Sequence, residues 1–498
     1  MSALPASLPV VTDPDVRRTY GVDSSFGATA PDDFEVVRAR DLADVVEVMK
    51  HAHEQRRPVV PQGARTGLTG AAVATSGCIV LNTEALSTIE IVDPVEGIAV
   101  AGPGVVTENL KKAARMEGMF YPPDPASSGS STLGGNVATN AGGLCCIKYG
   151  VTADYIRGLE VVLPGGEVIT TGRRTAKSSA GLDLTGLFVG SEGTLGVVTQ
   201  VITRLVPAPA DPLTALATFP TLTSAAEAIV ALRRDPHPPS LLEFLDEPSI
   251  AAVQALADYG FPQGCAAVLL VQSDRPGHVG EDAARYADLM SAHGADDIAV
   301  ADDAIEADAL LAGRRVLNTA LEAKGPNLIE DMCVPIRALP RLVEQGRELC
   351  AARGVEVTMS GHGGDGNLHP SIFLDPSDPD SLARGHAAFS DLVDLAIELG
   401  GTISGEHGIG TLKAPYLRRQ VGEAAIDRMR ALKAVFDPHG ICNPGKAYTG
   451  TAGGRGASAA SVSRPFPPGG RGASAASVSR PFLPVGRGAS AASVSRPW

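Results

Sequence analysis

The sequence predicts an α+β protein with two folded domains and a C-terminal tail that has no core. Upstream of residue 207, short Val- and Ile-rich runs alternate with amphipathic helical patterns, which indicates mixed strands and helices. The pattern restarts after the proline-rich stretch "VITRLVPAPADP" (201–212), so we place a domain boundary there. At 498 residues the chain is also longer than one ordinary domain.

The tail repeats itself. "GRGASAASVSRP" begins at Gly454, Gly470 and Gly486, with a period of 16 residues. Small, polar and Arg side chains bury little apolar surface, so a disordered tail grown by tandem duplication is the main interpretation, and a basic arm for a partner is the alternative. The expected segments are a first domain (1–207), a second domain (208–414), a C-terminal segment returning to the first (415–449) and the tail (450–498).

Individual elements follow from periodicity. "LADVVEVMKHAHEQ" (42–55) has the spacing of an amphipathic helix, and so do "LARGHAAFSDLVDLAIEL" (382–399) and "EAAIDRMRALKAVF" (423–436). "LATFPTLTSAAEAIVALRR" (216–234) predicts a strand, a turn and a helix. Strands are expected in "RPVVPQG" (57–63), "CIVLN" (78–82) and "GIAVAGPGV" (97–105).

Charge and cysteine usage exclude several classes of protein. Residues 1–449 carry 36 basic and 56 acidic side chains, a formal charge of −20, which argues against a nucleic-acid-binding surface. Seven cysteines without regular spacing predict no disulfide framework, and the N-terminus lacks signal-peptide character. No apolar run reaches the roughly 20 residues that cross a bilayer. We therefore expect a reduced, cytoplasmic protein.

Three glycine-rich loops lie in the first domain. "PVVPQGARTGLTGAAV" (58–73) follows a strand, and its glycines allow backbone N–H groups to face one anion, with Arg65 as an added charge. A plain tight turn explains this loop about as well. The long loop "YPPDPASSGSSTLGGNVATNAGGLCCIKYG" (121–150) is stronger evidence of a binding site, because loops of this length are commonly functional. "GSEGTLGVVTQV" (190–201) is the third loop and runs into a strand.

Two histidines flank the short loop in "GHGGDGNLHP" (361–370). The stretches "VEVTMSGH" (355–362) and "LHPSIFL" (368–374) predict the arms of a β-hairpin, which would bring His362 and His369 together. Both histidines are candidate metal ligands, although solvated side chains beside a turn are the simpler alternative.

A second polar pair strengthens the metal hypothesis. Glu406 and His407 are neighbours in the glycine-bounded segment "GTISGEHGIGTLK" (401–413). In an extended segment, adjacent side chains point to opposite sides, so one can bind a metal while the other faces a substrate. Two His and one carboxylate with open positions suit a divalent ion that binds substrate directly.

The three glycine loops, in this order, resemble the FAD-binding domain of the vanillyl-alcohol oxidase type family of flavoproteins. Within that family the chain is similar to the FAD subunits of glycolate oxidase and to D-lactate dehydrogenases, over roughly residues 30–448. The resemblance implies an FAD-binding domain, an α+β substrate (cap) domain and the following FAD-binding residues: Pro61, Gln62, Gly63, Ala64, Arg65, Thr66, Gly67, Leu68, Pro123, Ser128, Gly134, Gly135, Asn136, Asn140, Gly142, Gly143, Glu192, Gly193, Val197 and Asn443. Many relatives have Gly where this chain has Arg65.

The same resemblance implies roles in the second domain. His362, His369 and Glu406 are the expected ligands of a divalent metal, zinc, manganese or iron, and His407 is the expected catalytic base. Arg314 keeps the family position of an Arg that binds the substrate carboxylate, whereas Leu311 replaces a Trp. The chain has Ile329 where relatives acting on 2-hydroxyglutarate have Lys, which favours a short monocarboxylate.

The flavin is expected to be non-covalent. Some relatives attach FAD through His or Cys, but Cys145 and Cys146 are better explained as buried thiols. The resemblance also places Lys446, in "DPHGICNPGKAY" (437–448), near the phosphates or the substrate pocket.

These observations predict oxidation of a D-2-hydroxy acid, D-lactate or glycolate, to the 2-oxo acid, with hydride transfer to flavin N5. The alternatives are a non-redox flavin-dependent transferase of the same fold, D-2-hydroxyglutarate dehydrogenase, and a scaffold or electron-carrying subunit that has lost catalysis. The chain has neither a Cys cluster for iron–sulfur nor a nicotinamide fingerprint. The electron acceptor is therefore unknown, and an iron–sulfur or electron-transfer subunit is one candidate.

Overall fold

The computed structural model describes residues 3–261 and 264–449, and the repeat tail (450–498) for which we predict disorder lies outside this range. Within the described part, strands up to Pro207 pair only with one another, and so do strands from Leu213 onward, apart from isolated bridges. No helix in the described part is long and apolar enough to span a membrane.

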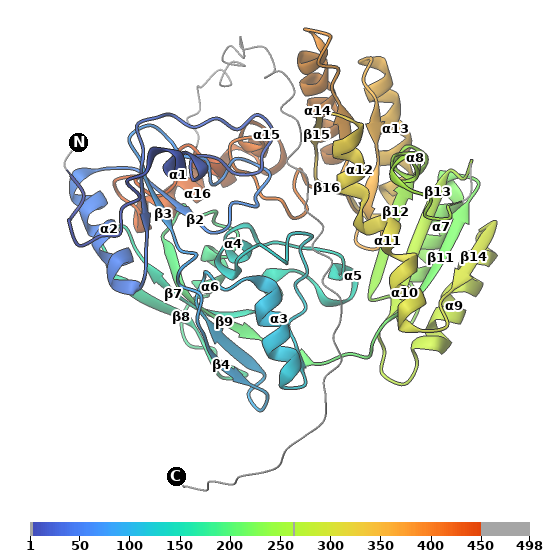
Figure 1. The fold of residues 1–498 in the computed structure, drawn as a ribbon, viewed down its shortest axis with the longest axis horizontal. Helices are drawn as coiled ribbons and strands as arrows, with labels where there is room; N and C mark the ends of the chain where they lie inside the picture. The colour runs from blue at the N-terminus through green and yellow to red at the C-terminus, as the bar shows by residue number, and fades with distance from the viewer. Residues whose placement is uncertain (1–2, 262–263, 450–498) are drawn as a thin grey trace, which may run out of the picture. The chain divides into compact units, whose positions relative to one another are not determined.

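The N-terminal part contains a parallel three-stranded sheet, in the order β1-β3-β2, and an antiparallel five-stranded sheet, in the order β4-β5-β9-β7-β8 (Figure 1). All four residues of β3 are buried, as is usual for a parallel strand covered on both faces, whereas β9 alternates buried and half-buried residues. The strands expected in 57–63, 78–82 and 97–105 are confirmed. The bounds are β1 Glu35–Arg38, β2 Val59–Gln62, β3 Ile79–Asn82, β4 Ile89–Asp93, β5 Ile98–Ala101, β7 Ile156–Val162, β8 Val168–Gly172 and β9 Val197–Arg204, with β6 Met119–Phe120 pairing β10 Val206–Pro207.

Helix α2 (Leu42–Gln55) shows how local sequence sets its bounds. The Asp41 side chain accepts the N–H of Asp44 as an N-cap, and the helix ends at Gln55, followed by the C-cap residue Arg56 in a left-handed conformation with φ of 50°. Its apolar face packs on the parallel sheet, so the helix predicted over 42–55 is confirmed. The other helices of this part are α1 Pro14–Thr19, α3 Thr107–Met116, α4 Leu133–Thr139, α5 Cys146–Tyr149 and α6 Thr185–Phe188.

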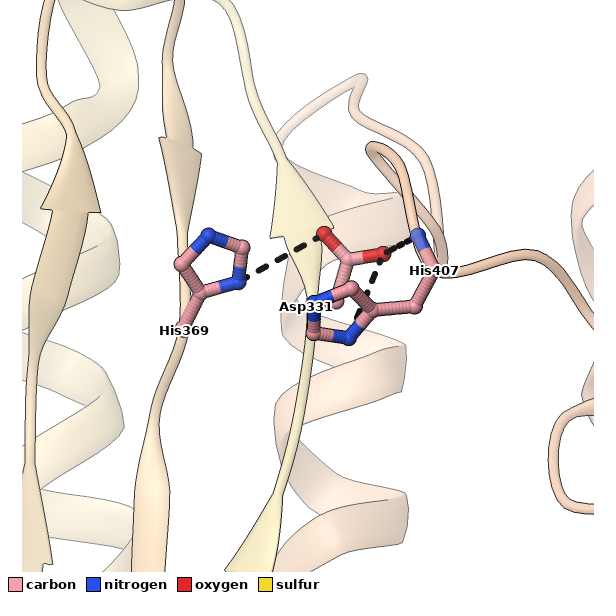
Figure 2. Close-up of side chains that lie close together, drawn as sticks. All are labelled: Asp331, His369 and His407. Atoms are coloured by element: carbon pink, nitrogen blue, oxygen red, sulfur yellow. Dashed lines mark hydrogen bonds and ion pairs between the residues drawn. The ribbon is translucent and has the colours of Figure 1, made fainter. Parts of the chain in front are cut away.

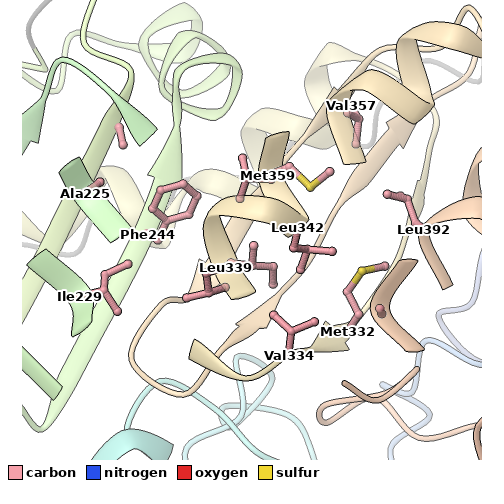
Figure 3. Packing of buried hydrophobic residues seen from close by; sticks show 14 of the residues in the cluster. Ala225, Ile229, Phe244, Met332, Val334, Leu339, Leu342, Val357, Met359 and Leu392 are labelled. Atoms are coloured by element: carbon pink, nitrogen blue, oxygen red, sulfur yellow. The ribbon is translucent and has the colours of Figure 1, made fainter. Parts of the chain in front are cut away.

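The C-terminal part is built on a seven-stranded sheet in the order β14-β11-β13-β12-β18-β19-β16. Helices pack on this sheet through one large apolar core, in which Phe244, Leu339, Leu342 and Met359 lie close together (Figure 3). The strands are β11 Leu213–Phe219, β12 Leu241–Asp246, β13 Ala267–Ser273, β14 Asp297–Val300, β16 Met332–Cys333, β18 Ser360–His362 and β19 Asn367–Leu368; a second sheet joins β15 Asn327–Ile329, β20 Ser371–Phe373 and β17 Val357–Thr358.

The helices of this part include α14, which confirms the helix predicted over 382–399, and α7, which together with β11 confirms the strand, turn and helix predicted over 216–234. Their bounds are α7 Leu222–Arg233, α8 Glu247–Leu256, α9 Val279–Ala292, α10 Ala304–Leu310, α11 Ala312–Arg315, α12 Leu317–Lys324, α13 Leu339–Ala352 and α14 Ser381–Glu398.

The last described segment packs against the first sheets. After α15 (Ala414–Val421), helix α16 (Glu423–Phe436) confirms the helix predicted over 423–436. Lys433 Nζ donates to the carbonyl of Thr194 at 2.7 Å, and Cys442 forms a parallel bridge with Val59 of β2. These contacts join the segment to strands and loops of the N-terminal part.

Candidate active site

A cavity of about 480 Å³ lies where the three glycine-rich loops meet. Six of the expected FAD-binding residues do not line it, namely Pro123, Ser128, Asn140, Gly142, Gly143 and Asn443. Those that do are Pro61, Gln62, Gly63, Ala64, Arg65, Thr66, Gly67, Leu68, Gly134, Gly135, Asn136, Glu192, Gly193 and Val197.

The loop after β2 approaches α4 closely at Gly63. A Cβ at Gly63 would lie 2.2 Å from Thr132 Oγ1, so any other residue there would force the Thr132 side chain to move. Arg65 has a φ of 62°, the left-handed conformation that glycine adopts without strain. Its guanidinium lies 3.3 Å from Glu84 and stacks on the ring of Tyr20 at 4.5 Å, so its charge is partly neutralised within the protein.

The cavity walls hold buried polar atoms that suit a polar cofactor. Gln62 donates its amide to the carbonyls of Tyr20 and Ala72, which fixes its orientation. Gln62 Oε1 and Thr132 Oγ1 have no hydrogen-bond partner among the described residues, although both are buried. Since such atoms are normally paired, they fit a ligand that donates hydrogen bonds, as FAD does. Sequence reasoning missed Thr132, whose hydroxyl is one of many in that loop.

The hairpin that carries the two histidines is confirmed. Strands β18 and β19 pair antiparallel, with Gly361 opposite Leu368 and His362 opposite Asn367. The ring centroids of His362 and His369 are 5.1 Å apart. Because β12 and β16 flank the hairpin in the large sheet, both His362, at the end of β18, and His369, directly after β19, are well supported.

Glu406 and His407 lie on an irregular bend rather than in the extended segment that the sequence suggested, and both side chains approach His369. The Glu406 carboxylate lies beside His369, and the His407 ring stacks on His369 with centroids 5.0 Å apart and an interplanar angle of 12°. Flanking glycines allow the bend, since Gly408 has a φ of 85° and a Cβ at Gly405 would meet Asn367 Nδ2 at 2.1 Å.

The expected metal ligands converge. Glu406 Oε1 lies 3.2 Å from His362 Nε2 and 3.3 Å from His369 Nε2. Ligand bonds of 2.0–2.1 Å around a tetrahedral zinc separate neighbouring ligand atoms by about 3.3 Å. The ligand atoms of the three residues all lie within 4.8 Å of one another, so the set fits a divalent ion.

Two buried carboxylates behind the histidines were not expected from the sequence. Glu243, on β12, accepts from His362 Nδ1 at 2.6 Å and from Arg314 Nε at 2.6 Å. Asp331 lies 3.7 Å from His369 Nδ1 and accepts the backbone N–H of His407 at 2.8 Å (Figure 2). Arg314 itself does not line the cavity, whereas Asn318 and Glu322 of α12 do.

Burial and charge shift the ionisation of this cluster in opposite directions. Burial lowers the pKa of His407 to about 4, against the opposing effect of Asp331, so its ring is neutral at pH 7. For His362, burial is outweighed by Glu243 and Glu406, which raise its pKa well above the ordinary value. Burial would raise the pKa of Glu406, but His362 and His369 lower it well below its usual range.

Comparisons with known proteins agree with this architecture. Residues 35–172 match the family described as FAD binding domain, and residues 208–447 match FAD linked oxidases, C-terminal domain. The chain is 40% identical to the glycolate oxidase subunit GlcD of Bacillus subtilis, over 83% of this chain and 88% of the relative. It is 35% identical to a D-lactate dehydrogenase of Archaeoglobus fulgidus, over 84% of this chain and 92% of the relative.

Among solved structures, p-cresol methylhydroxylase with substrate bound superposes with a TM-score of 0.74 at 17% identity, covering 88% of this chain and 94% of that one. At this identity the likeness concerns the fold. The FAD-binding fold of the vanillyl-alcohol oxidase type, expected from the glycine loops, is thereby confirmed.

Proposed function

The chain belongs to the FAD-linked oxidase family, which consists of FAD-dependent oxidoreductases and includes glycolate oxidase subunits and D-lactate dehydrogenases, and from this premise we propose that it oxidises a small D-2-hydroxy acid to the 2-oxo acid. Glycolate and D-lactate are the proposed substrates. One observation carries the proposal: Glu406 and His407 line the same cavity as the glycine loops. The proposed metal ligand and the proposed proton acceptor therefore face the space that suits the flavin.

Bound FAD would supply the hydride acceptor for this reaction. The backbone of Gln62–Leu68 would hold the diphosphate, and the other cavity-lining residues would hold the remaining parts of the cofactor. The resemblance also assigns Asn443, whose side-chain amide donates to the carbonyls of Ala71 and Glu192 at 2.9 and 2.7 Å. The Asn443 side chain thus supports Ala71 and Glu192, two residues that line the cavity.

His362, His369 and Glu406 would hold a divalent metal, which lowers the pKa of a hydroxyl bound to it. His407 would accept the hydroxyl proton at Nε2, because its Nδ1 faces Asp331 Oδ2 at 4.0 Å. The neighbouring rings of His369 and His407 would thus keep the metal ligand and the base side by side.

The proposed substrate is a short monocarboxylate. Arg314 Nε is occupied by Glu243, so the terminal nitrogens of Arg314 are proposed to bind the substrate carboxylate. Ile329, on β15, has no charge for a second carboxylate. D-2-hydroxyglutarate is therefore the less favoured substrate.

The reduced flavin would pass its electrons to a partner. The relative in Bacillus subtilis is named a subunit, which supports an assembly with an electron-accepting protein for this chain as well. An iron–sulfur or electron-transfer subunit is the proposed class of partner.

Anaerobic mixing of the purified protein with D-lactate, glycolate, L-lactate and D-2-hydroxyglutarate tests the proposal. We expect D-lactate or glycolate to bleach the flavin absorbance fastest. Faster bleaching by D-2-hydroxyglutarate would reassign the enzyme to dicarboxylates. Bleaching by none of the four would contradict the proposal and favour the non-redox transferase.

A further inference from the structure

Asp331, between β15 and β16, is fully buried and accepts hydrogen bonds on both carboxylate oxygens. Oδ2 accepts the backbone N–H groups of Glu406 and His407 at 3.0 and 2.8 Å, and the hydroxyl of Ser404 at 2.9 Å. Oδ1 accepts from Asn367 Nδ2 at 2.7 Å. One carboxylate thus binds the backbone of both functional residues on the bend.

The same carboxylate faces a histidine. His369 Nδ1 is buried and has no hydrogen-bond partner among the described residues, and it lies 3.7 Å from Asp331 Oδ1. Glu243 occupies the equivalent place behind His362, at 2.6 Å from Nδ1. A carboxylate behind a ligating histidine fixes the ring tautomer and leaves the other nitrogen free for the metal.

Asp331, His369 and His407 are also close enough together to hold an ion (Figure 2). The hydrogen bonds argue against this use, because three N–H or O–H donors already occupy Oδ2, the Asp331 oxygen that faces His407. In addition, the two rings stack nearly parallel, at 12°, rather than meeting edge to edge. The geometry fits orientation of the rings better than a second cation site.

We propose that Asp331 is a positioning residue that holds the His369 ring and the Glu406–His407 backbone in one arrangement, so that metal ligand and proton acceptor are presented together. The proposal rests on the proposed function for its catalytic consequence. Its structural part, the immobilisation of the 404–407 bend, stands without it.

Asp331→Asn is the direct test, because Asn has nearly the same shape but replaces one acceptor oxygen with an N–H₂ donor. We expect this variant to bind Zn²⁺ or Mn²⁺ about 10- to 100-fold more weakly, as measured by competition with a chromophoric chelator, and to keep FAD bound. Wild-type metal affinity in Asp331→Asn would overturn the proposal.

Asp246→Asn is the matched control. Asp246 is also fully buried, but its carboxylate binds Ser249, Arg347 and the Met359 N–H rather than an expected ligand. Its substitution should lower stability and leave metal affinity unchanged. Equal metal loss in both variants would contradict a specific role for Asp331.

Amide hydrogen exchange tests the proposal without a measurement of metal binding. In the wild-type holoenzyme, the Glu406 and His407 amides should be protected despite their irregular bend, and Asp331→Asn should expose them while Asp246→Asn does not. Fast exchange of both amides in the wild type would overturn the proposal even if the variant does not fold. If instead the wild type shows protection but binds no divalent ion, the metal-dependent function fails and the positioning of the bend stands.

Discussion

Glu192 Oε2 accepts the backbone N–H of Gly410 at 2.7 Å, and Oε1 accepts that of Ile409 at the same distance. The third glycine loop is thereby joined to the segment that follows His407. Burial raises the pKa of Glu192, against the two N–H donors that lower it. A residue expected to line the FAD site therefore also anchors the segment of the proposed base.

Glu192→Gln should loosen this anchor, because the amide cannot accept at both positions. We expect a loss of about 1–3 kcal/mol in the free energy of unfolding, measured by urea denaturation, and slower anaerobic flavin reduction with metal content unchanged. The exposed Glu90→Gln, whose partner is Gln200, is the control. Wild-type stability and reduction rate in Glu192→Gln would show that this contact contributes neither to the free energy of unfolding nor to flavin reduction.

His407→Ala and Glu406→Ala should have different defects although the residues are neighbours. Without His407 the protein should keep metal and FAD but reduce its flavin roughly 10²- to 10⁴-fold more slowly, because the proton acceptor is gone. Without Glu406 only two neutral imidazoles remain, so metal affinity should fall.

Stopped-flow reduction and metal analysis of both variants separate these outcomes. The assignment is wrong if His407→Ala reduces at the wild-type rate, or if Glu406→Ala retains full metal occupancy. Partial metal loss in both variants would mean that ligand and base functions are not divided between them.

Removal of the metal by a chelator should abolish flavin reduction by substrate and leave FAD bound. The expected ligands lie on β18, near β19 and on the 406–407 bend, whereas the loop proposed to bind the FAD diphosphate follows β2. Single-turnover reduction of metal-free protein, followed by absorbance, measures the effect, and re-addition of the ion is the control. An unchanged rate of flavin reduction in rigorously metal-free protein would contradict the metal hypothesis.

Acid precipitation should release intact FAD into the supernatant. Burial raises the pKa of Cys145 to about 12 and also raises that of Cys146, so neither thiol is a reactive thiolate at pH 8. Iodoacetamide should accordingly spare both in the folded protein and modify both after denaturation, as read by mass spectrometry. Flavin that stays in the protein pellet would contradict non-covalent binding.

Elements with strong local periodicity were predictable. The helices over 42–55 and 423–436 agree with α2 and α16, and the hairpin around His362 and His369 follows from its glycine-rich turn. In each case the pattern lies within a few consecutive residues, so propensity and turn chemistry suffice.

Contacts between distant residues were not predictable in the same way. Asp331 and Glu406 are 75 positions apart, and nothing local marks their pairing. The bend at Glu406–His407 depends on the close approach of Gly405 to Asn367, which is a tertiary contact. Glu243 did leave a signal, because it is the charged residue inside the otherwise apolar run "LLEFL", and a buried carboxylate in such a strand requires a partner.

The segment after Glu406 is tied to both halves of the protein, which has a thermodynamic consequence. Asp331 binds its start, while Glu192 and the carbonyl of Thr69 bind residues 409–412. Ordering a segment costs conformational entropy. The first ligand that orders this segment therefore leaves a smaller entropic cost for the second ligand. We therefore expect FAD and the proposed metal to strengthen each other's binding by the same factor, although no residue is proposed to contact both.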